Sequence, residues 1–246
     1  MVEFFALLFG LAIGSFLNVV VHRLPRRLSL SSPPSQCPRC GTPILTRHNV
    51  PVLGWIVLRG RCAACKEPIS VRYPLVEAGT GLVFAALAWR LDDLGLLSAL
   101  PAYLWFASTG IALALIDLEL RKLPNRIILP SYPILAVLLT ASAAWEHVWW
   151  PLARAGIGAV ALLGFFVLLS LTGGMGGGDV KLAGLLGGVL AYLSWWTLVI
   201  GAFGGFLLGA VVGVVVMATG RGGRKTALPF GPFMIAAALL AVLVAG

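Results

Sequence analysis

The sequence predicts an all-α polytopic membrane protein with about eight transmembrane helices and one small soluble insertion. Hydrophobic residues make up 59% of the 246 positions, charged residues make up 11%, and the mean hydropathy is +0.98. A soluble chain of this length cannot bury so many apolar side chains, so most of its surface must face lipid. The apolar residues also gather into runs of about 16 to 20 positions, each about long enough to cross the hydrocarbon layer as a helix.

These runs define the expected spans and, with the insertion, the expected domains. The spans cover residues 2–21, 74–90, 100–116, 126–144, 152–171, 182–199, 201–219 and 229–245. Glycines link the sixth and seventh runs, so the boundary between them is open. The chain therefore divides into a first transmembrane helix at 1–21, an insertion at 22–73 and a seven-helix membrane core at 74–246.

Basic residues are concentrated in alternate loops. If the amino terminus lies outside, the inner loops hold 16 of the 18 Lys and Arg residues. These are Arg23, Arg26, Arg27, Arg39, Arg47, Arg59, Arg61, Lys66, Arg72, Arg121, Lys122, Arg126, Lys181, Arg221, Arg224 and Lys225. Only Arg90 and Arg154 fall near the outer side, so the positive-inside rule predicts this topology. Membrane orientation also explains the pI near 10.0, and no nucleic-acid partner is expected.

The insertion holds all four cysteines in two CxxC pairs, Cys37 with Cys40 and Cys62 with Cys65, separated by 21 residues. This spacing is similar to that of a zinc ribbon, in which four thiolates close a tetrahedral structural site. Disulfide bonds are the alternative, which the predicted cytoplasmic placement disfavours because thiols stay reduced there. The sequence therefore predicts a small cytoplasmic zinc-ribbon-like insertion whose Zn²⁺ ligands are the four cysteines.

Asp117 ends an apolar run at the carboxyl end of an expected helix. The helix dipole disfavours a negative charge at that end, so a purely structural role explains Asp117 poorly. The structural alternative is an ion pair with Arg121, one helical turn further on. An ionisable group at membrane depth is costly and usually functional, so Asp117 is a candidate catalytic residue.

Asp179 follows the glycine-rich stretch at 173–178 and precedes an expected helix. An aspartate in that position can simply cap the helix. A cap does not explain the glycines, which permit unusual dihedrals and a close approach of the backbone to a substrate. Two carboxylates brought together can share one proton and activate water for hydrolysis, so Asp117 and Asp179 form a candidate pair. For the neighbouring Lys181, a side chain that reaches toward the membrane interface is favoured over one that orients the glycine loop.

The segment Gly-Gly-Gly-Asp at 176–179 is a GxGD motif, and together with Asp117 it resembles the GxGD-type intramembrane aspartyl proteases. Further segments resemble the pattern of bacterial type IV prepilin peptidases over nearly the whole chain. They are GSFLNVVVHRLP at 14–25, NVP at 49–51, ISVRYPLVE at 69–77 and LPFGPF at 228–233. The chain departs from that pattern at Asn125, where the family more often has an aspartate.

The resemblance implies a bifunctional leader peptidase and N-methyltransferase in the bacterial cytoplasmic (inner) membrane. Such enzymes cut the basic leader from type IV prepilins or type II secretion pseudopilins after a glycine, and then methylate the new amino terminus with S-adenosylmethionine. By motif position, Asp117 matches the first catalytic aspartate and Asp179 the second. The active site is then expected to face the cytoplasm. Neither the particular pilin nor the oligomeric state follows from the sequence.

The methyltransferase half has no recognisable nucleotide-binding fingerprint, so its cofactor site is expected in residues 22–73 and at neighbouring helix ends. Glu77 is the candidate S-adenosylmethionine-binding residue, with an ordinary first-turn helix acid as the alternative. A peptidase that lacks methylation is one alternative function. A proton-coupled transporter that uses Asp117 and Asp179 as a relay is another, although no internal repeat supports it.

Overall fold

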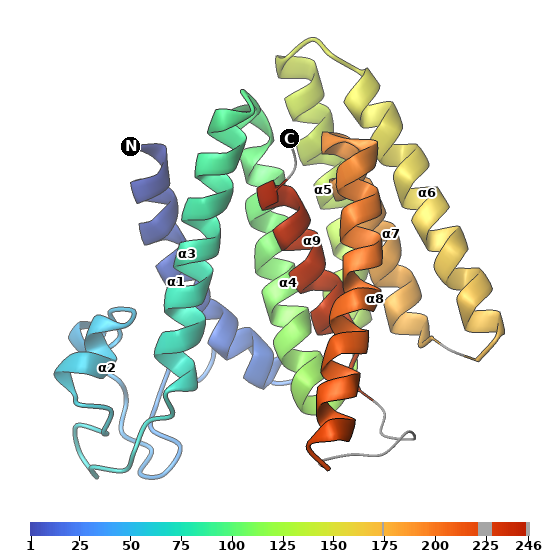
Figure 1. Ribbon diagram of the computed structural model, residues 1–246. Coiled ribbons are helices and arrows are strands. Elements are labelled where there is room, and N and C mark those ends of the chain that lie inside the picture. The colour runs from blue at the N-terminus through green and yellow to red at the C-terminus, as the bar shows by residue number, and fades with distance from the viewer. Residues whose placement is uncertain (174, 221–227, 245–246) are drawn as a thin grey trace. The chain divides into compact units, whose positions relative to one another are not determined.

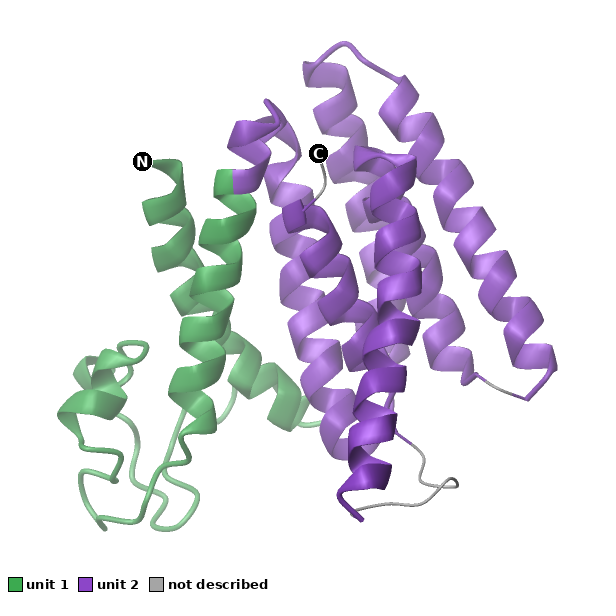
Figure 2. Cartoon of the chain, in the orientation of Figure 1, with its two compact units in different colours: residues 1–89 green, residues 90–246 purple. Residues whose placement is uncertain are grey.

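The computed structural model describes residues 1–173, 175–220 and 228–244. Within these ranges the chain is helical and contains no strand, apart from two isolated bridges, Gln36 with Pro43 and Arg61 with Pro68. It separates into two compact units, residues 1–89 and 90–246, which Figure 2 shows in green and purple. The prediction of an all-α membrane fold is confirmed.

The first unit consists of α1 (Val2–Arg23), the short α2 (Leu53–Val57) and most of α3 (Arg72–Asp93). Glycines let α1 and α3 approach closely. A Cβ added at Gly10 would lie 2.8 Å from the Gly81 Cα, and one added at Gly14 would lie 2.7 Å from the Glu77 Cα. Small residues at such crossings are typical of helix pairs in membranes, where close backbone packing replaces the hydrophobic driving force.

The second unit contains the remaining helices, which Figure 1 shows from green to red. They are α4 (Leu100–Leu120), α5 (Asn125–Trp145), α6 (Trp150–Leu171), α7 (Gly177–Leu193), α8 (Trp195–Ala218) and α9 (Gly231–Val244). A single 3₁₀ turn, η2 (Leu97–Ala99), precedes α4. Helices α6 and α7 cross at Gly158 and Gly187, where a Cβ on either residue would overlap the backbone of the other. Most of the side chains of α7 from Leu182 onward are buried, so this helix lies at the centre of the unit.

Six of the described helices are long and apolar enough to cross a membrane: α1, α3, α4, α5, α6 and α8, the span of α4 being counted from Leu97. Helices α7 and α9 correspond to two further predicted spans but have only 17 and 14 residues. The number of eight crossings therefore stays a prediction. The division between the sixth and seventh runs lies at Ser194 and not near residue 200. Ser194 is extended (φ −165°, ψ 164°) and its side chain accepts from the Thr197 amide, so a serine cap starts α8 before the glycines, which lie inside this helix.

Arg154 fixes the carboxyl end of α7. Its guanidinium group donates to the main-chain oxygens of Ala191, Tyr192 and Leu193 at 2.5 to 2.6 Å. The last carbonyls of a helix have no partner within the helix, and a cation there is also favoured by the dipole. One arginine on α6 therefore holds the end of α7 in place.

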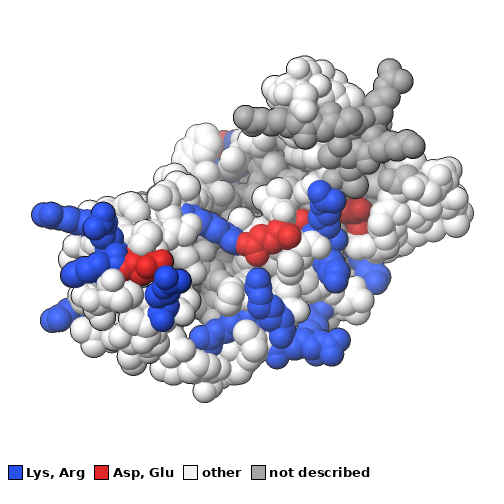
Figure 3. All heavy atoms as spheres, turned by 90° about the horizontal axis from the view of Figure 1, so that it is seen from below, with Lys and Arg blue, Asp and Glu red and all other residues white. Residues whose placement is uncertain are grey.

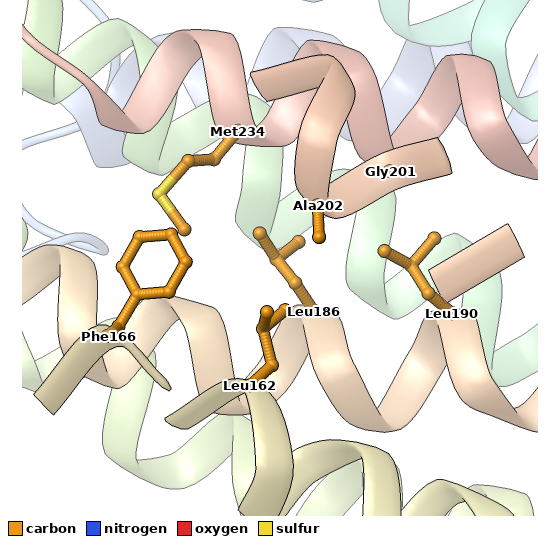
Figure 4. A pocket seen from close by; sticks show the side chains of 7 residues that line it. All are labelled: Leu162, Phe166, Leu186, Leu190, Gly201, Ala202 and Met234. Carbon is orange, nitrogen blue, oxygen red and sulfur yellow. The ribbon is translucent and has the colours of Figure 1, made fainter. Parts of the chain in front are cut away.

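Four helices of the second unit enclose a narrow apolar hollow, shown in Figure 4. Its lining comes from α6, α7, α8 and α9 and consists of Leu162, Phe166, Leu186, Leu190, Gly201, Ala202 and Met234. The ring of Phe166 also contacts the rings of Phe206 and Phe230, with centroids 5.7 and 6.4 Å away. This apolar layer anchors the segment that leads into α9.

Candidate active site and metal centre

Asp117 lies in the last turn of α4 and only 5% of it is exposed. Its Oδ2 accepts a hydrogen bond of 3.2 Å from the amide of Gly231, the first residue of α9. The helix ends three residues later, where Arg121 takes a left-handed conformation with φ 52°. Among the described residues no ion pair joins Asp117 to Arg121, so the structural alternative for Asp117 receives no support.

Asp179 is the third residue of α7 and is partly buried. Its Oδ2 accepts a hydrogen bond of 3.3 Å from the amide of Gly176, so it also caps its own helix, as the alternative interpretation expected. It lies outside the six candidate spans. Burial, followed by the negative charge of Asp117, raises the pKa of Asp179 to about 6. A neighbouring carboxylate has this effect only when it is close, which indicates that the two aspartates share one site.

Leu123, in the loop after α4, contacts both segments that flank the two aspartates. A Cβ added at Gly178 would lie 2.9 Å from the Leu123 Cβ, and one added at Gly231 would lie 3.3 Å from its Cδ2 and 2.9 Å from the Asp117 Oδ2. A methyl group at either position would force its neighbour to move, so glycine permits this close packing. The starts of α7 and α9 thus converge on the end of α4.

Helix α5 holds the start of α7. The hydroxyl of Tyr132 donates to the Lys181 carbonyl at 2.6 Å, and the ammonium group of Lys181 donates to the Asn125 side chain at 3.0 Å. A Cβ at Gly184 would overlap the Tyr132 hydroxyl, so only glycine admits this contact. The Lys181 side chain thus ties the turn that carries Asp179 to the start of α5. This is the orienting role, and the interpretation that the sequence favoured, a side chain reaching only toward the membrane interface, is not supported.

Glu77 lies in the second turn of α3 and is 8% exposed. Its Oε2 accepts a hydrogen bond of 2.7 Å from the amide of Val52, which immediately precedes α2. No ion pair involves Glu77 among the described residues. The carboxylate thus acts on the backbone of the insertion rather than as a simple first-turn helix acid.

The four cysteines come together in the first unit. Their Sγ atoms all lie within 4.8 Å of one another, with Cys37 to Cys65 at 3.8 Å and Cys40 to Cys62 at 4.0 Å. A tetrahedral zinc ion with Zn–S bonds of about 2.3 Å would place its sulfurs about 3.8 Å apart. The donor set and the spacing therefore fit a closed four-thiolate metal site, and the cluster can hold a metal ion.

Basic residues lie at helix ends and loops rather than along the apolar helices. Arg23 ends α1, Arg72 begins α3, Lys122 follows α4 and Lys181 is in the first turn of α7. Lys and Arg side chains are prominent at the surface in the view of Figure 3. The predicted inner residues Arg221, Arg224 and Lys225 lie outside the described residues.

This arrangement can support hydrolysis by a carboxylate pair. Asp117 and Asp179 come from two helices and interact electrostatically, and an added Cβ at Gly177, two residues before Asp179, would meet no neighbour within 4 Å. The sequence did not single out three residues of this site, namely Leu123, Tyr132 and Gly231. Gly231 was noted only as part of the LPFGPF segment at 228–233, which matches a family pattern. No local sequence feature distinguishes Leu123 or Tyr132 from ordinary loop and helix residues.

The fold and the site define an integral membrane protein with one buried and one partly buried aspartate in one unit and a four-thiol cluster in the other. Residues 8–91 match the family model described as bacterial peptidase A24 N-terminal domain, and residues 104–214 match that of the type IV leader peptidase family. The chain belongs to the type IV leader peptidase family.

Curated relatives cover nearly all of the chain. A prepilin leader peptidase/N-methyltransferase of Pseudomonas putida is 38% identical over 267 residues, covering 97% of this chain and 89% of the relative. Proteins of the same name from Aeromonas hydrophila and Burkholderia pseudomallei (strain K96243) are 38% and 36% identical, covering 96% and 94% of this chain and 88% and 82% of the relatives. No solved structure gives a significant match.

Proposed function

We propose that this chain is a membrane aspartyl endopeptidase and N-methyltransferase that acts on type IV prepilins or type II secretion pseudopilins. It removes the basic leader after a glycine and then methylates the new terminal residue with S-adenosylmethionine. The name that the relatives share, prepilin leader peptidase/N-methyltransferase, supports both activities. The observation that carries the peptidase assignment is that Gly178, next to Asp179, and Gly231, which contacts Asp117, both lie against Leu123, together with the effect of the Asp117 charge on Asp179.

In this proposal the two aspartates share one proton and have different roles. Asp179, whose pKa is raised to about 6, keeps its proton more readily than an ordinary aspartate and polarises the scissile carbonyl. Asp117, oriented by the Gly231 amide, takes a proton from the attacking water. The pair titrates as a unit, because two interacting like charges do not ionise independently. The glycine backbone before Asp179 leaves space for the unwound substrate strand.

The insertion at 22–73 and the neighbouring helix ends would carry the methyl transfer. Cys37, Cys40, Cys62 and Cys65 would bind a structural Zn²⁺, which holds the insertion at 22–73 in shape. Glu77 would serve the S-adenosylmethionine site beside this insertion. The division into a first helix at 1–21, the zinc-binding domain at 22–73 and the peptidase core at 74–246 follows from these roles.

The substrate explains the proposed orientation. A prepilin has an apolar helix in the membrane and a basic leader on the cytoplasmic side, so its cleavage requires a site that faces inward. The positive-inside distribution supports this placement in the bacterial inner membrane, with the ends of α1 and α4 and the starts of α3, α5 and α7 in the cytoplasm.

Conservative replacement of each aspartate tests the proposal. Asp117→Asn and Asp179→Asn should each abolish cleavage of a purified prepilin, because neither half of a shared acid and base pair works alone. The double variant should be no worse than either single variant. Methylation of a supplied mature pilin should persist in all three, and its absence from the wild-type protein would favour the peptidase-only alternative. Substantial cleavage by either folded single variant would defeat the assignment.

A further inference from the structure

Val52 has an unusual backbone conformation. Its φ is 62° and its ψ is −51°, and the amide of Leu53 donates to the Pro51 carbonyl at 2.6 Å. These values describe a γ-turn with a positive central φ, which is rare and strained. A β-branched residue is especially unfavourable there because its side chain crowds the backbone. Such a conformation persists only where surrounding contacts hold it.

The holding contact comes from α3. The Oε2 of Glu77 accepts the Val52 amide at 2.7 Å, which is within the short range typical of hydrogen bonds to a charged acceptor. Glu77 is itself fixed, because α1 passes so close that a Cβ on Gly14 would lie 2.7 Å from the Glu77 Cα. Asn18 of α1 also donates to the Tyr73 carbonyl at 3.3 Å. The Glu77 carboxylate therefore projects from a rigid helix pair. It fixes the position of the Val52 turn, and the turn does not determine the position of the carboxylate.

The turn joins this helix pair to the four-thiol cluster. Helix α2 starts at the next residue, and its Trp55 donates to the Ile69 carbonyl at 3.0 Å. The Ile69 amide in turn donates to the Gly60 carbonyl at 2.7 Å, which closes the loop around the second cysteine pair. A chain of contacts thus runs from the metal-binding segment through α2 to Val52 and Glu77.

We infer that Glu77 is a positioning residue for methyl transfer, which acts by holding Val52 in its strained turn and so fixes the insertion against α3. This inference rests on the proposed methyltransferase function and replaces direct contact with the methyl donor by an indirect role. Methyl transfer needs the donor carbon and the acceptor amine in line, and a misplacement of about 1 Å can cost about 100-fold in rate. A carboxylate that fixes the insertion can therefore control the reaction without touching either reactant.

The test combines Glu77 variants with a glycine that accepts the turn by itself. The full-length, zinc-loaded protein is compared as wild type, Glu77→Gln, Glu77→Ala and the double variants Glu77→Ala/Val52→Gly and Glu77→Ala/Val50→Gly. Glycine adopts a positive φ without steric cost, so Val52→Gly removes the need for the carboxylate. Val50→Gly is the matched control, because it adds a glycine to the same loop at a residue without a positive φ.

Three readouts separate the possible roles: the kcat and KM for methylation of a mature pilin, prepilin cleavage, and the rate of tryptic cleavage at Arg47 and Arg59, which flank the turn. Glu77→Ala should lower kcat for methylation about 100-fold and speed tryptic cleavage, while prepilin cleavage stays unchanged. Glu77→Gln keeps an acceptor oxygen and should stay within about fivefold of wild type. In the Glu77→Ala protein, Val52→Gly should raise kcat for methylation at least about tenfold and restore the protection from trypsin. Val50→Gly should do neither.

Two results would overturn the inference. One is a Glu77→Ala/Val52→Gly protein that regains protection from trypsin but not methylation, which would make Glu77 a direct ligand of a reactant. The other is a Glu77→Gln protein as inactive as Glu77→Ala, which would show that the negative charge itself is needed. A wild-type protein that transfers no methyl group, yet shows the expected tryptic pattern, would instead refute the proposed methyltransferase function and leave the role of Glu77 in the turn supported.

Discussion

Replacement of Gly231 by alanine should impair peptide cleavage without unfolding the protein. The new Cβ would lie 2.9 Å from the Asp117 Oδ2 and 3.3 Å from the Leu123 Cδ2, so the carboxylate must move by a few tenths of an ångström or more. The movement also weakens the hydrogen bond that the Gly231 amide donates to Asp117. If a 1 Å misplacement costs about 100-fold, a shift of a few tenths of an ångström should lower kcat by about 4- to 10-fold, or about 0.8 to 1.4 kcal/mol in the barrier.

The assay is cleavage of a purified prepilin at several substrate concentrations, with thermal unfolding measured on the same samples. The value of kcat should fall while KM changes little, because the substitution displaces a reacting group and not a binding surface. Gly213→Ala on α8 is the control, since its Cβ would meet only the Leu228 Cδ1 at an ordinary 3.9 Å. A folded Gly231→Ala protein with kcat within twofold of wild type would refute the proposed contact between Gly231 and a catalytic carboxylate.

Further predictions concern α7 and the metal centre. Asp179→Asn should melt at a higher temperature than wild type at pH 8 and at the same temperature near pH 4. The pKa of Asp179 is raised to about 6 in the folded protein, so the protonated carboxyl stabilises the fold at low pH and this stabilisation is lost as the pH rises through that value. A difference in melting temperature between the two proteins that stays constant from pH 4 to pH 8 would contradict the raised pKa. Gly184→Ala should lower the free energy of unfolding by about 1 to 3 kcal/mol. Combining it with Tyr132→Phe should recover part of that loss, because the hydroxyl that the new Cβ overlaps is gone. Additive losses in a double-mutant cycle would argue against the contact between the two residues. Purified protein should contain about one zinc per chain by metal analysis, and Cys62→Ser should lose it. The insertion should then unfold before prepilin cleavage is lost. A metal-free protein with an ordered insertion would exclude the zinc site.

The sequence predicted the parts of this protein that depend on local composition. Apolar runs gave the helices, and the CxxC spacing gave the thiol cluster, because both patterns follow from the chemistry of neighbouring residues. Asp117 stood out since a carboxylate at membrane depth needs a compensating reason, and Asp179 stood out because a helix cap does not explain the glycines before it. The catalytic role of the two aspartates stays a prediction, although the structure brings them to the same site.

The features that escaped prediction depend on tertiary contacts. The break at Ser194 was hidden because a serine cap and an extended residue can divide a continuous apolar run. Tyr132 lies in an apolar helix between two prolines and resembled any interface aromatic, yet its hydroxyl reaches the backbone of α7. Leu123 looked like an ordinary loop residue, and its role appears only once Gly178 and Gly231 lie against it.

The contacts of α7 suggest why glycines surround Asp179 on both sides. After it, Gly184 and Gly187 let α5 and α6 press against the helix, and Arg154 holds its far end, so the body of α7 cannot shift. Before it, the glycine-rich segment makes few such contacts, since neither Gly173 nor Gly177 has a neighbour near an added Cβ. The same residue type therefore fixes the helix that carries one carboxylate and leaves open the backbone beside it. A site for hydrolysis of an extended peptide needs both properties, because the carboxylate must stay in place while the substrate strand finds room next to it.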